Sequence, residues 1–269
     1  MSRLLVQLLR LGYYLQVTEV EMEKAIGVIG GVGPYAGLDL VKKVFDNTIA
    51  TSDQEHVDLY LTSTPSIIGD RTRFLLEGGE NPADGLYACF EKLAKIGASV
   101  VVIPCNTAHA SPIYDVLREK ATRSHPDVQL LNMILETCGT VSSMFPKGAR
   151  IGLLATKGTH AVGVYRHYFE QYPNLELLEP DASGQERVHQ AIYDTTYGIK
   201  AVFPVSQKAL AVLLREGKHL VERGADAIIL GCTELPLALH EGVLPCPLVD
   251  PTTILARAAL GAIALDKLR

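Results

Sequence analysis

Short aliphatic segments that end abruptly in small or polar residues are the dominant hydrophobic pattern of this chain. In one of them, the β-branched run Val100–Ile103 is followed by the polar, turn-forming run Pro104–Thr107. In another, Ala227–Leu230 is followed by Gly231–Glu234. A continuous aliphatic run bounded by turn residues is typical of a fully buried strand in a parallel sheet. Open α/β sheets bind ligands at the carboxyl ends of their strands, so both polar runs are candidate parts of a binding site.

The two segments belong to a longer internal repeat. Aligning residues 96–107 with residues 223–234 superposes Cys105 on Cys232, at an offset of 127 residues. A second pair, residues 25–31 and 150–156, matches at an offset of 125 residues. Any two α/β crossovers can share a Gly-Ala pair before a strand, but two matches at nearly one offset favour a true repeat. We therefore expect two similar α/β halves, each with one cysteine at a strand end.

Strands alternate with helices along the rest of the chain, a pattern that predicts βαβ units and parallel sheets. The stretch at residues 63–81 is rich in Pro, Gly and charged residues and is expected to be a loop. The expected strands are residues 26–29, 57–62, 100–103, 128–134, 151–154, 227–230 and 248–249, and the expected helices are residues 35–48, 82–96, 111–122, 186–193, 206–223 and 252–268.

Residues 1–21 fit this pattern poorly. Leu4–Leu15 is apolar but is interrupted by Arg10, and no small-residue cleavage site follows, which argues against a signal peptide. Met22 would place the first strand directly after an initiator methionine. We expect residues 1–21 to be a dispensable extension, with a short surface helix as the alternative.

Composition excludes several classes of protein. A net charge of −5 over 269 residues argues against nucleic acid as a main partner. No apolar run approaches the ~20 residues that a membrane span needs. The five cysteines form no CxxC metal pattern, and a chain of this length does not need disulfides. We expect reduced thiols, a cytoplasmic location, no metal site, and neither a membrane nor a nucleic-acid partner.

Six short motifs stand at or near the expected strand ends and turns. They are GGVGP at residues 30–34, DRT at 70–72, PCNTAH at 104–109, LLATKGT at 153–159, YGIK at 197–200 and GCTEL at 231–235. Together they resemble the motifs of the cofactor-independent aspartate racemases, within the aspartate/glutamate/hydantoin racemase superfamily. The resemblance runs from about Ala25 to the C-terminus and is carried by the two cysteine motifs together more than by either alone.

The resemblance implies an α/β protein of two similar, pseudo-twofold-related domains, each with a mainly parallel sheet flanked by helices. It places the active site between the domains and implies a homodimer that needs no cofactor. On this basis we expect a first domain of residues 22–122 plus 249–269 and a second domain of residues 123–248.

Two cysteines at related strand ends suit the chemistry of a racemase. Racemisation removes a proton from one face of Cα and delivers another to the opposite face, so Cys105 and Cys232 are the expected acid/base pair. A thiol pKa of ~8.5 falls toward neutral beside cations or helix N-termini, and a thiolate and a thiol then form a matched pair. A buried free cysteine is often only a small packing residue, which is our interpretation of Cys89, Cys138 and Cys246.

The carbanion formed at Cα must be stabilised by hydrogen-bond donors when no pyridoxal cofactor accepts the charge. The resemblance selects the residues that would contact the substrate's α-carboxylate and amino group. Helix capping is the alternative role for Asn and Thr at these positions. The expected substrate contacts are Asn106, Thr107, Thr156 and Thr233, with Glu234 and Gly31 as further candidates.

An acidic amino acid also carries a side-chain carboxylate, which a guanidinium or an ammonium group binds best. The resemblance selects Arg71 and Lys200 for this small acidic substrate, although surface exposure is the usual fate of such cations. His109 is a further candidate that would orient groups or tune the thiol of Cys105. A solvated helix position is the alternative for His109.

Two departures from glutamate racemases favour aspartate as the substrate. Glutamate racemases carry Asp-Ser after the first strand and a His directly after the second Cys-Thr. This chain has Gly30–Gly33 and Glu234 at these places. Broader activity on acidic amino acids, including glutamate, stays open.

Two other functions are compatible with part of the sequence. An NAD(P)-dependent oxidoreductase is suggested by Gly31, Gly33 and Gly37 after the first strand, but their spacing departs from GxGxxG and Pro34 removes a backbone N–H from the turn. A non-catalytic binder of acidic amino acids would keep Arg71 and Lys200 but would not need two thiols.

Overall fold

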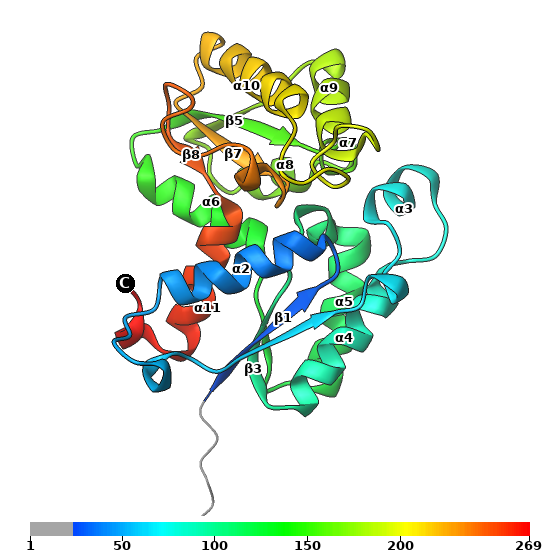
Figure 1. Ribbon diagram of the computed structural model, residues 1–269, viewed down its shortest axis with the longest axis vertical. Helices are drawn as coiled ribbons and strands as arrows, with labels where there is room; N and C mark the ends of the chain where they lie inside the picture. Colours follow the sequence, from blue (N-terminus) through cyan, green and yellow to red (C-terminus); the bar gives the residue numbers. More distant parts are fainter. Residues whose placement is uncertain (1–23) are drawn as a thin grey trace, which may run out of the picture.

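Two lobes of α/β structure make up the chain, each built around a parallel sheet of four strands (Figure 1). This computed structural model describes residues 24–269, so the extension expected at residues 1–21 lies outside the described residues. Helices α2, α6 and α11 lie where the lobes meet (Figure 1). The helices are α2 (Pro34–Asp46), α3 (Arg71–Glu77), α4 (Ala83–Lys95), α5 (Ser111–Ser124), α6 (Met133–Met144), α7 (Lys157–Ala161), α8 (Val164–Phe169), α9 (Ala182–Tyr193), α10 (Gln207–Glu222) and α11 (Pro251–Ile263).

Both sheets have the same strand order, which confirms the repeat and the α/β fold. The first sheet has the order β2-β1-β3-β4 and the second the order β6-β5-β7-β8, with all pairs parallel. The two segment pairs matched in the sequence are β1 with β5 and β3 with β7, the central strands of each sheet. The strands are β1 (Ala25–Gly30), β2 (Leu59–Ser63), β3 (Ala98–Val102), β4 (Gln129–Leu130), β5 (Ala149–Ala155), β6 (Leu175–Leu178), β7 (Ala227–Gly231) and β8 (Leu248–Val249).

The glycines conserved between the two repeats have a conformational role. Gly97 and Gly224 have φ angles of 101° and 91°, a region that residues with a side chain rarely adopt. Each glycine follows a helix, α4 or α10, and turns the chain into the central strand β3 or β7. The matched Gly-Ala pairs therefore mark two equivalent helix-to-strand turns.

Three apolar clusters hold these layers together. The outer face of the first sheet packs against α4 and α5, and the outer face of the second packs against α9 and α10. The inner faces of both sheets share one cluster, in which Val28 and Val100 are joined with Ile151 and Ile229 through α2, α6, α8 and α11. A shared core of this kind fixes the lobes against each other and brings the carboxyl ends of their strands together.

The prediction of a strand at residues 128–134 is wrong in part. Only Gln129–Leu130 is a strand, and α6 begins at Met133, because the Asn132 side chain accepts hydrogen bonds from the backbone N–H groups of Ile134 and Leu135. A short apolar run has no periodicity that separates a strand from a buried helix. Since β4 pairs with β3, the first sheet continues beyond the boundary expected at residue 122.

Several short elements were not expected from the sequence. The stretch at residues 63–81 contains α3 rather than loop alone, and the second lobe gains α7, α8 and β6. These elements are four to seven residues long, too short to show a periodic pattern.

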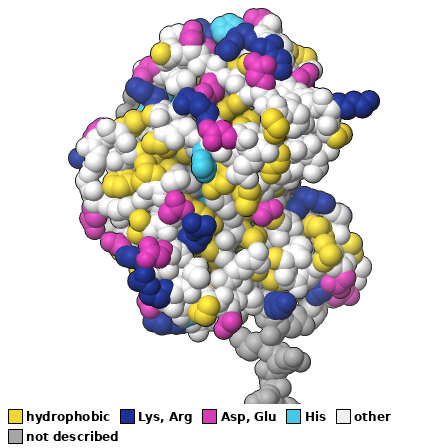
Figure 2. Space-filling view, turned by 180° about the vertical axis from the view of Figure 1, so that it is seen from behind, with side chains coloured by type: hydrophobic (Ala, Val, Ile, Leu, Met, Phe, Trp, Pro, Cys, Tyr) yellow, Lys and Arg dark blue, Asp and Glu magenta, His cyan; other side chains and the backbone are white. Residues whose placement is uncertain are grey.

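The surface carries charges of both signs in a mixed pattern, which Figure 2 shows on the back of both lobes. Among residues 24–269, no helix combines the length and the hydropathy that crossing a membrane would require.

Candidate active site

A small interdomain cavity lies at the carboxyl ends of the central strands of both sheets. Its volume is about 10 Å³, room for about one water molecule. Nine of the residues that line it were expected from the sequence, and two more, Val32 and Tyr193, were not. The expected lining residues are Arg71, Cys105, Asn106, Thr107, Thr156, Lys200, Cys232, Thr233 and Glu234.

Each domain contributes one thiol to this cavity. Cys105 follows β3 and Cys232 follows β7, and their exposed fractions are 7% and 6%. The Cys232 thiol donates a hydrogen bond of 3.0 Å to Oε2 of Glu234. Burial raises the pKa of Cys232 well above its ordinary value, and the Glu234 carboxylate raises it further, while Lys200 opposes this. Cys232 therefore rests as a thiol whose proton lies toward Glu234.

Arg71 lies beside Cys105 at the first turn of α3. It is 9% exposed, its Nη1 donates to the Gly69 carbonyl at 3.1 Å, and its Nε has no partner in the described part of the chain. Burial lowers the pKa of Arg71, but the neighbouring Cys105 and Tyr193 raise it more, so the net shift is upward. Arg71 is thus a buried, charged donor with hydrogen-bonding capacity left for an anion.

Helix α3 brings Arg71 across to the second domain. Asp70 caps this helix by accepting a hydrogen bond of 2.7 Å from the Arg73 N–H. Thr72 then packs against α7 so closely that a Cβ on Gly158 would lie 2.8 Å from the Thr72 Oγ1. A glycine at residue 158 therefore permits the close contact between α3 and α7.

Lys200 pairs with Glu234 in the lining of the cavity. Its Nζ donates to the Glu234 Oε1, and the Tyr193 ring centroid lies 5.4 Å from the same Nζ. The turn that carries Lys200 is held to α9 by backbone hydrogen bonds from Ile199 to Ala191 and from Lys200 to Ile192. Burial lowers the pKa of Lys200, but Glu234 and Cys232 outweigh it, so the pKa of Lys200 is raised and the ammonium stays charged.

Asn106 offers a free donor to the cavity. Its Oδ1 accepts a hydrogen bond of 2.6 Å from the Tyr165 hydroxyl of α8, and its buried Nδ2 has no partner among the described residues. Tyr165 comes from the second domain and fixes the amide with its NH₂ group available. A buried donor without a partner is unfavourable unless a ligand satisfies it.

Hydroxyl groups from both domains meet at the opposite part of the lining. Thr107 Oγ1 lies 3.0 Å from Thr159 Oγ1 and 3.4 Å from Thr156 Oγ1. Thr156 also caps α7 by accepting a hydrogen bond from the Thr159 N–H. Thr233 Oγ1 instead donates to the Pro104 carbonyl at 3.0 Å, so this side chain ties the two domains together.

Two further candidates, His109 and Gly31, lie outside the cavity lining. His109 is fully buried, its Nδ1 lies 2.9 Å from the Cys105 carbonyl oxygen, and its ring stacks on Tyr114. It is a positioning residue for the Cys105 peptide. Gly31 has a φ angle of 81°, and a Cβ there would lie 2.9 Å from the Thr64 backbone nitrogen, so this glycine shapes the turn after β1.

The burial of His109 predicts a pH-dependent loss of stability. Burial lowers the pKa of His109 from 6.5 to about 4, so the unfolded chain binds a proton that the folded chain does not across this interval. Stability from the neutral ring is present above pH ~6.5 and is lost as the pH falls toward ~4. We expect the free energy of unfolding to drop by about 2 kcal/mol from this group between pH ~7 and pH ~5. Urea denaturation of wild type and His109→Gln at both pH values checks this; equal pH dependence of the two would contradict it.

Tyr193, Tyr165, Thr159 and Val32 are the site residues that sequence reasoning missed. Tyr193 ends α9 just before the YGIK motif, and burial raises its pKa to about 12. Val32 and Thr159 lie inside the GGVGP and LLATKGT motifs, so the sequence marked their segments but not these side chains. Nothing in the local sequence separates Tyr165 and Tyr193 from ordinary core positions, because Tyr165 contacts Asn106 of the other domain and Tyr193 contacts Lys200.

An entrance pocket of about 160 Å³ adjoins the interdomain cavity. The two share Arg71, Tyr193, Lys200 and Glu234 as lining residues. Tyr35 of the first domain also lines the entrance pocket and stacks on Phe203, which follows Lys200, at 5.2 Å between ring centroids. An amino acid is much larger than the space inside, so it can reach the thiols only if the cavity widens from this entrance.

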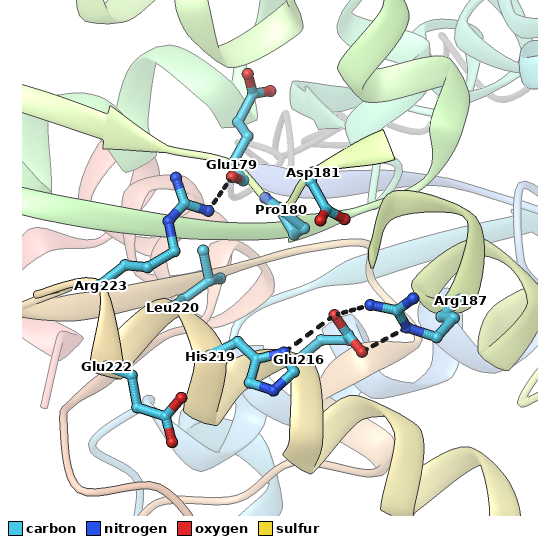
Figure 3. Close-up of a pocket in the computed structure, with 9 residues that line it drawn as sticks. All are labelled: Glu179, Pro180, Asp181, Arg187, Glu216, His219, Leu220, Glu222 and Arg223. Atoms are coloured by element: carbon cyan, nitrogen blue, oxygen red, sulfur yellow. Dashed lines mark hydrogen bonds and ion pairs between the residues drawn. The ribbon is translucent and has the colours of Figure 1, made fainter. Parts of the chain in front are cut away.

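A larger cavity of about 420 Å³ lies on the second domain between β6, α9 and α10 (Figure 3). Arg187 there forms two contacts of 2.7 and 3.1 Å with Glu216, and Arg223 donates to the Glu179 carbonyl (Figure 3). Both arginines of this cavity are thus already paired, and its lining has more carboxylates than arginines, so the cavity does not suit an acidic ligand.

No three His, Cys, Asp or Glu side chains within residues 24–269 converge as metal ligands do.

The interdomain cavity combines two thiols, one from each domain, with two cations and free hydrogen-bond donors. Thiols can exchange protons with a bound molecule near neutral pH. The cations and donors suit a small molecule with more than one carboxylate. This arrangement can move protons on a small acidic compound.

Comparisons with known proteins point the same way. Residues 29–259 match the family model described as Asp/Glu/Hydantoin racemase. Picrophilus torridus aspartate racemase is 27% identical with a TM-score of 0.76, over 89% of this chain and 94% of that one. A glutamate racemase from Francisella tularensis, solved in complex with D-glutamate, is 18% identical with a TM-score of 0.60, over 91% of this chain and 82% of that one, a likeness of fold alone.

Relatives found by sequence carry different substrate names. The broad specificity amino-acid racemase RacX of Bacillus subtilis is 24% identical over 246 residues, which cover 87% of this chain and 96% of that protein. The glutamate racemase of Corynebacterium diphtheriae is 30% identical over 168 residues, 62% of this chain. The chain spans only 56% of the length of that glutamate racemase.

Proposed function

This chain belongs to the Asp/Glu/hydantoin racemase family, and we propose that it interconverts L- and D-aspartate without a cofactor, using Cys105 and Cys232 as the acid/base pair. One observation carries the proposal: the two thiols come from equivalent strand ends of a repeated fold and line a single cavity. Groups related by such a repeat can approach a bound molecule from opposite sides. A non-catalytic binder would not need both.

The proposed reaction is two proton transfers at Cα. The thiolate of one cysteine removes the α-proton, and the thiol of the other protonates the opposite face of the carbanion. The charge that develops on the α-carboxylate is stabilised by fixed donors, for which the free Nδ2 of Asn106 and the hydroxyls of Thr107 and Thr156 are available.

Arg71 and Lys200 are proposed to bind the side-chain carboxylate. Arg71 is buried and Lys200 is partly buried. Both charged side chains line the entrance pocket as well as the cavity, so a dicarboxylate would meet them on its way to the thiols. Charged donors bind carboxylates more strongly than neutral ones.

Aspartate is the proposed substrate because of Glu234 after the second Cys-Thr and the likeness to the Picrophilus enzyme. A broader acidic range, including glutamate, is the second candidate, and the names of the Bacillus and Corynebacterium relatives favour it. By the motif resemblance we also propose a cytoplasmic homodimer.

L-Aspartate incubated with the purified protein and no added cofactor is expected to lose its optical rotation completely. The two enantiomers have equal free energy, so the reaction stops at equal amounts of each. L-Glutamate assayed in parallel should react more slowly, and equal rates would indicate the broader range. Unchanged rotation with folded protein would refute the proposal, and tight aspartate binding in that case would favour the binder. Binding of NAD(P) would favour the oxidoreductase.

A further inference from the structure

Glu234 is the carboxylate of the interdomain cavity, and both of its oxygens are engaged. Oε1 accepts from the Lys200 ammonium, and Oε2 accepts from the Cys232 thiol at 3.0 Å. The side chain is 4% exposed. Gly33 makes room for it, since a Cβ at this glycine would lie 2.3 Å from Oε1.

The Lys200–Glu234 ion pair lies on the boundary between the entrance pocket and the cavity, because both residues line both spaces. A dicarboxylate that enters must therefore pass the pair. It also carries the chemical group to which Lys200 is already bound. The protein thus holds its own carboxylate where the second carboxylate of a substrate would go.

We propose that Lys200 exchanges Glu234 for the side-chain carboxylate of the substrate, and that this exchange releases Glu234 to accept the proton of Cys232. This deepens the proposed function and rests on it in assigning Lys200 to the second carboxylate. In the ligand-free protein the pair keeps the cavity closed and Cys232 protonated.

The exchange changes the proton affinity of Glu234. A buried carboxylate that loses its cation is an unpaired buried charge, which is unfavourable and which uptake of a proton neutralises. The Glu234 Oε2 already accepts the thiol hydrogen, so the Cys232 S–H bond breaks and a Glu234 O–H bond forms without rearrangement. Cys232 becomes the thiolate that removes the α-proton, and it does so only when an acidic side chain is bound.

The protons balance over one turnover in this direction. Cys232 gives its proton to Glu234 and then takes the α-proton from the substrate. Cys105 gives its proton to the opposite face of the carbanion. When the product leaves, Lys200 returns to Glu234, which loses its proton to solvent, and the Cys105 thiolate regains a proton from solvent.

Binding of succinate tests the exchange without requiring turnover, since succinate has two carboxylates but no amino group. We expect Glu234→Gln to bind succinate about tenfold or more tightly than wild type in calorimetry, because no internal carboxylate competes for Lys200. Lys200→Gln should bind it more weakly than wild type.

Glu91→Gln is the matched control, since it removes an exposed ion pair with Lys95 on α4 and should bind succinate as wild type does. A second measurement needs no Glu234 variant. Succinate added to wild type should produce the infrared band of a protonated carboxyl and the ultraviolet absorbance of a thiolate. In Lys200→Gln added succinate should change neither signal, because no ammonium is present to exchange between carboxylates.

Equal or weaker succinate binding by folded Glu234→Gln would overturn the exchange. If that variant does not fold, absence of both spectroscopic signals in succinate-saturated wild type would overturn it. The racemisation assay is independent of these results. If wild type racemises aspartate but succinate produces neither spectroscopic signal, only the exchange is refuted. If succinate produces both signals but aspartate is not racemised, only the proposed function is refuted.

Discussion

Replacing either Cys105 or Cys232 by serine is expected to abolish racemisation of aspartate, lowering kcat by roughly 10²- to 10⁴-fold. A hydroxyl does not ionise near neutral pH, so serine can neither remove the α-proton nor replace it at a useful rate. Each thiol is proposed to serve one face of Cα, and neither can stand in for the other. Chiral chromatography of aspartate over time measures the loss.

Isotope exchange separates the two half-reactions. In D₂O the wild-type product should carry deuterium early, while recovered substrate stays largely protiated, because each thiol is fixed to one face. The resemblance to aspartate racemases assigns Cys232 to the L-enantiomer and Cys105 to the D-enantiomer. Cys105→Ser should therefore still exchange the α-proton of L-aspartate, and Cys232→Ser that of D-aspartate.

Cys246→Ser is the control for the thiol variants, because this half-exposed cysteine does not line the interdomain cavity. Its activity should equal that of wild type. Near wild-type racemisation by Cys105→Ser or Cys232→Ser would refute the paired-thiol mechanism. A swap of the exchange preferences would refute only the facial assignment.

Arg71→Ala and Lys200→Ala are each expected to raise KM for aspartate by roughly 10- to 150-fold. The loss of one charge-assisted hydrogen bond to a desolvated carboxylate costs about 1.5–3 kcal/mol. Arg71 is buried and Lys200 is partly buried in the lining of the cavity, so water does not replace them freely. Steady-state kinetics with aspartate at several concentrations measures the effect.

The KM change of Lys200→Ala also includes the effect of breaking an ion pair, because removing the lysine leaves Glu234 buried without a cation. The double variant Lys200→Ala with Glu234→Gln removes both charges and shows the effect of the lysine alone. Lys157→Ala breaks an exposed pair with Glu186 outside the cavity and should leave KM unchanged. Unchanged KM in both Arg71→Ala and Lys200→Ala would place the side-chain pocket elsewhere.

Local sequence signals were sufficient to predict the repeated α/β fold of this protein. Aliphatic runs ending in polar residues marked β3 and β7, and the repeated Gly-Ala pairs marked the turns before them. These signals depend on backbone preference and on burial, which a few neighbouring residues determine. The repeat then placed Cys105 and Cys232 at equivalent positions, and parallel topology placed both at a ligand-binding edge. Short elements such as α3 and β6 have too few residues to carry such a signal.

Only the tertiary structure decided how the site residues meet. The pairing of Lys200 with Glu234 spans 34 residues, and the Thr233 hydrogen bond to Pro104 spans 129. Tyr165 orients Asn106 from the other domain, and Glu234 proved to lie between a cation and a thiol. Such contacts depend on how the shared core positions two lobes, which no local pattern encodes. Local sequence patterns specify the repeated α/β fold and the residue types of the site, while packing of the lobes specifies which of these side chains contact one another.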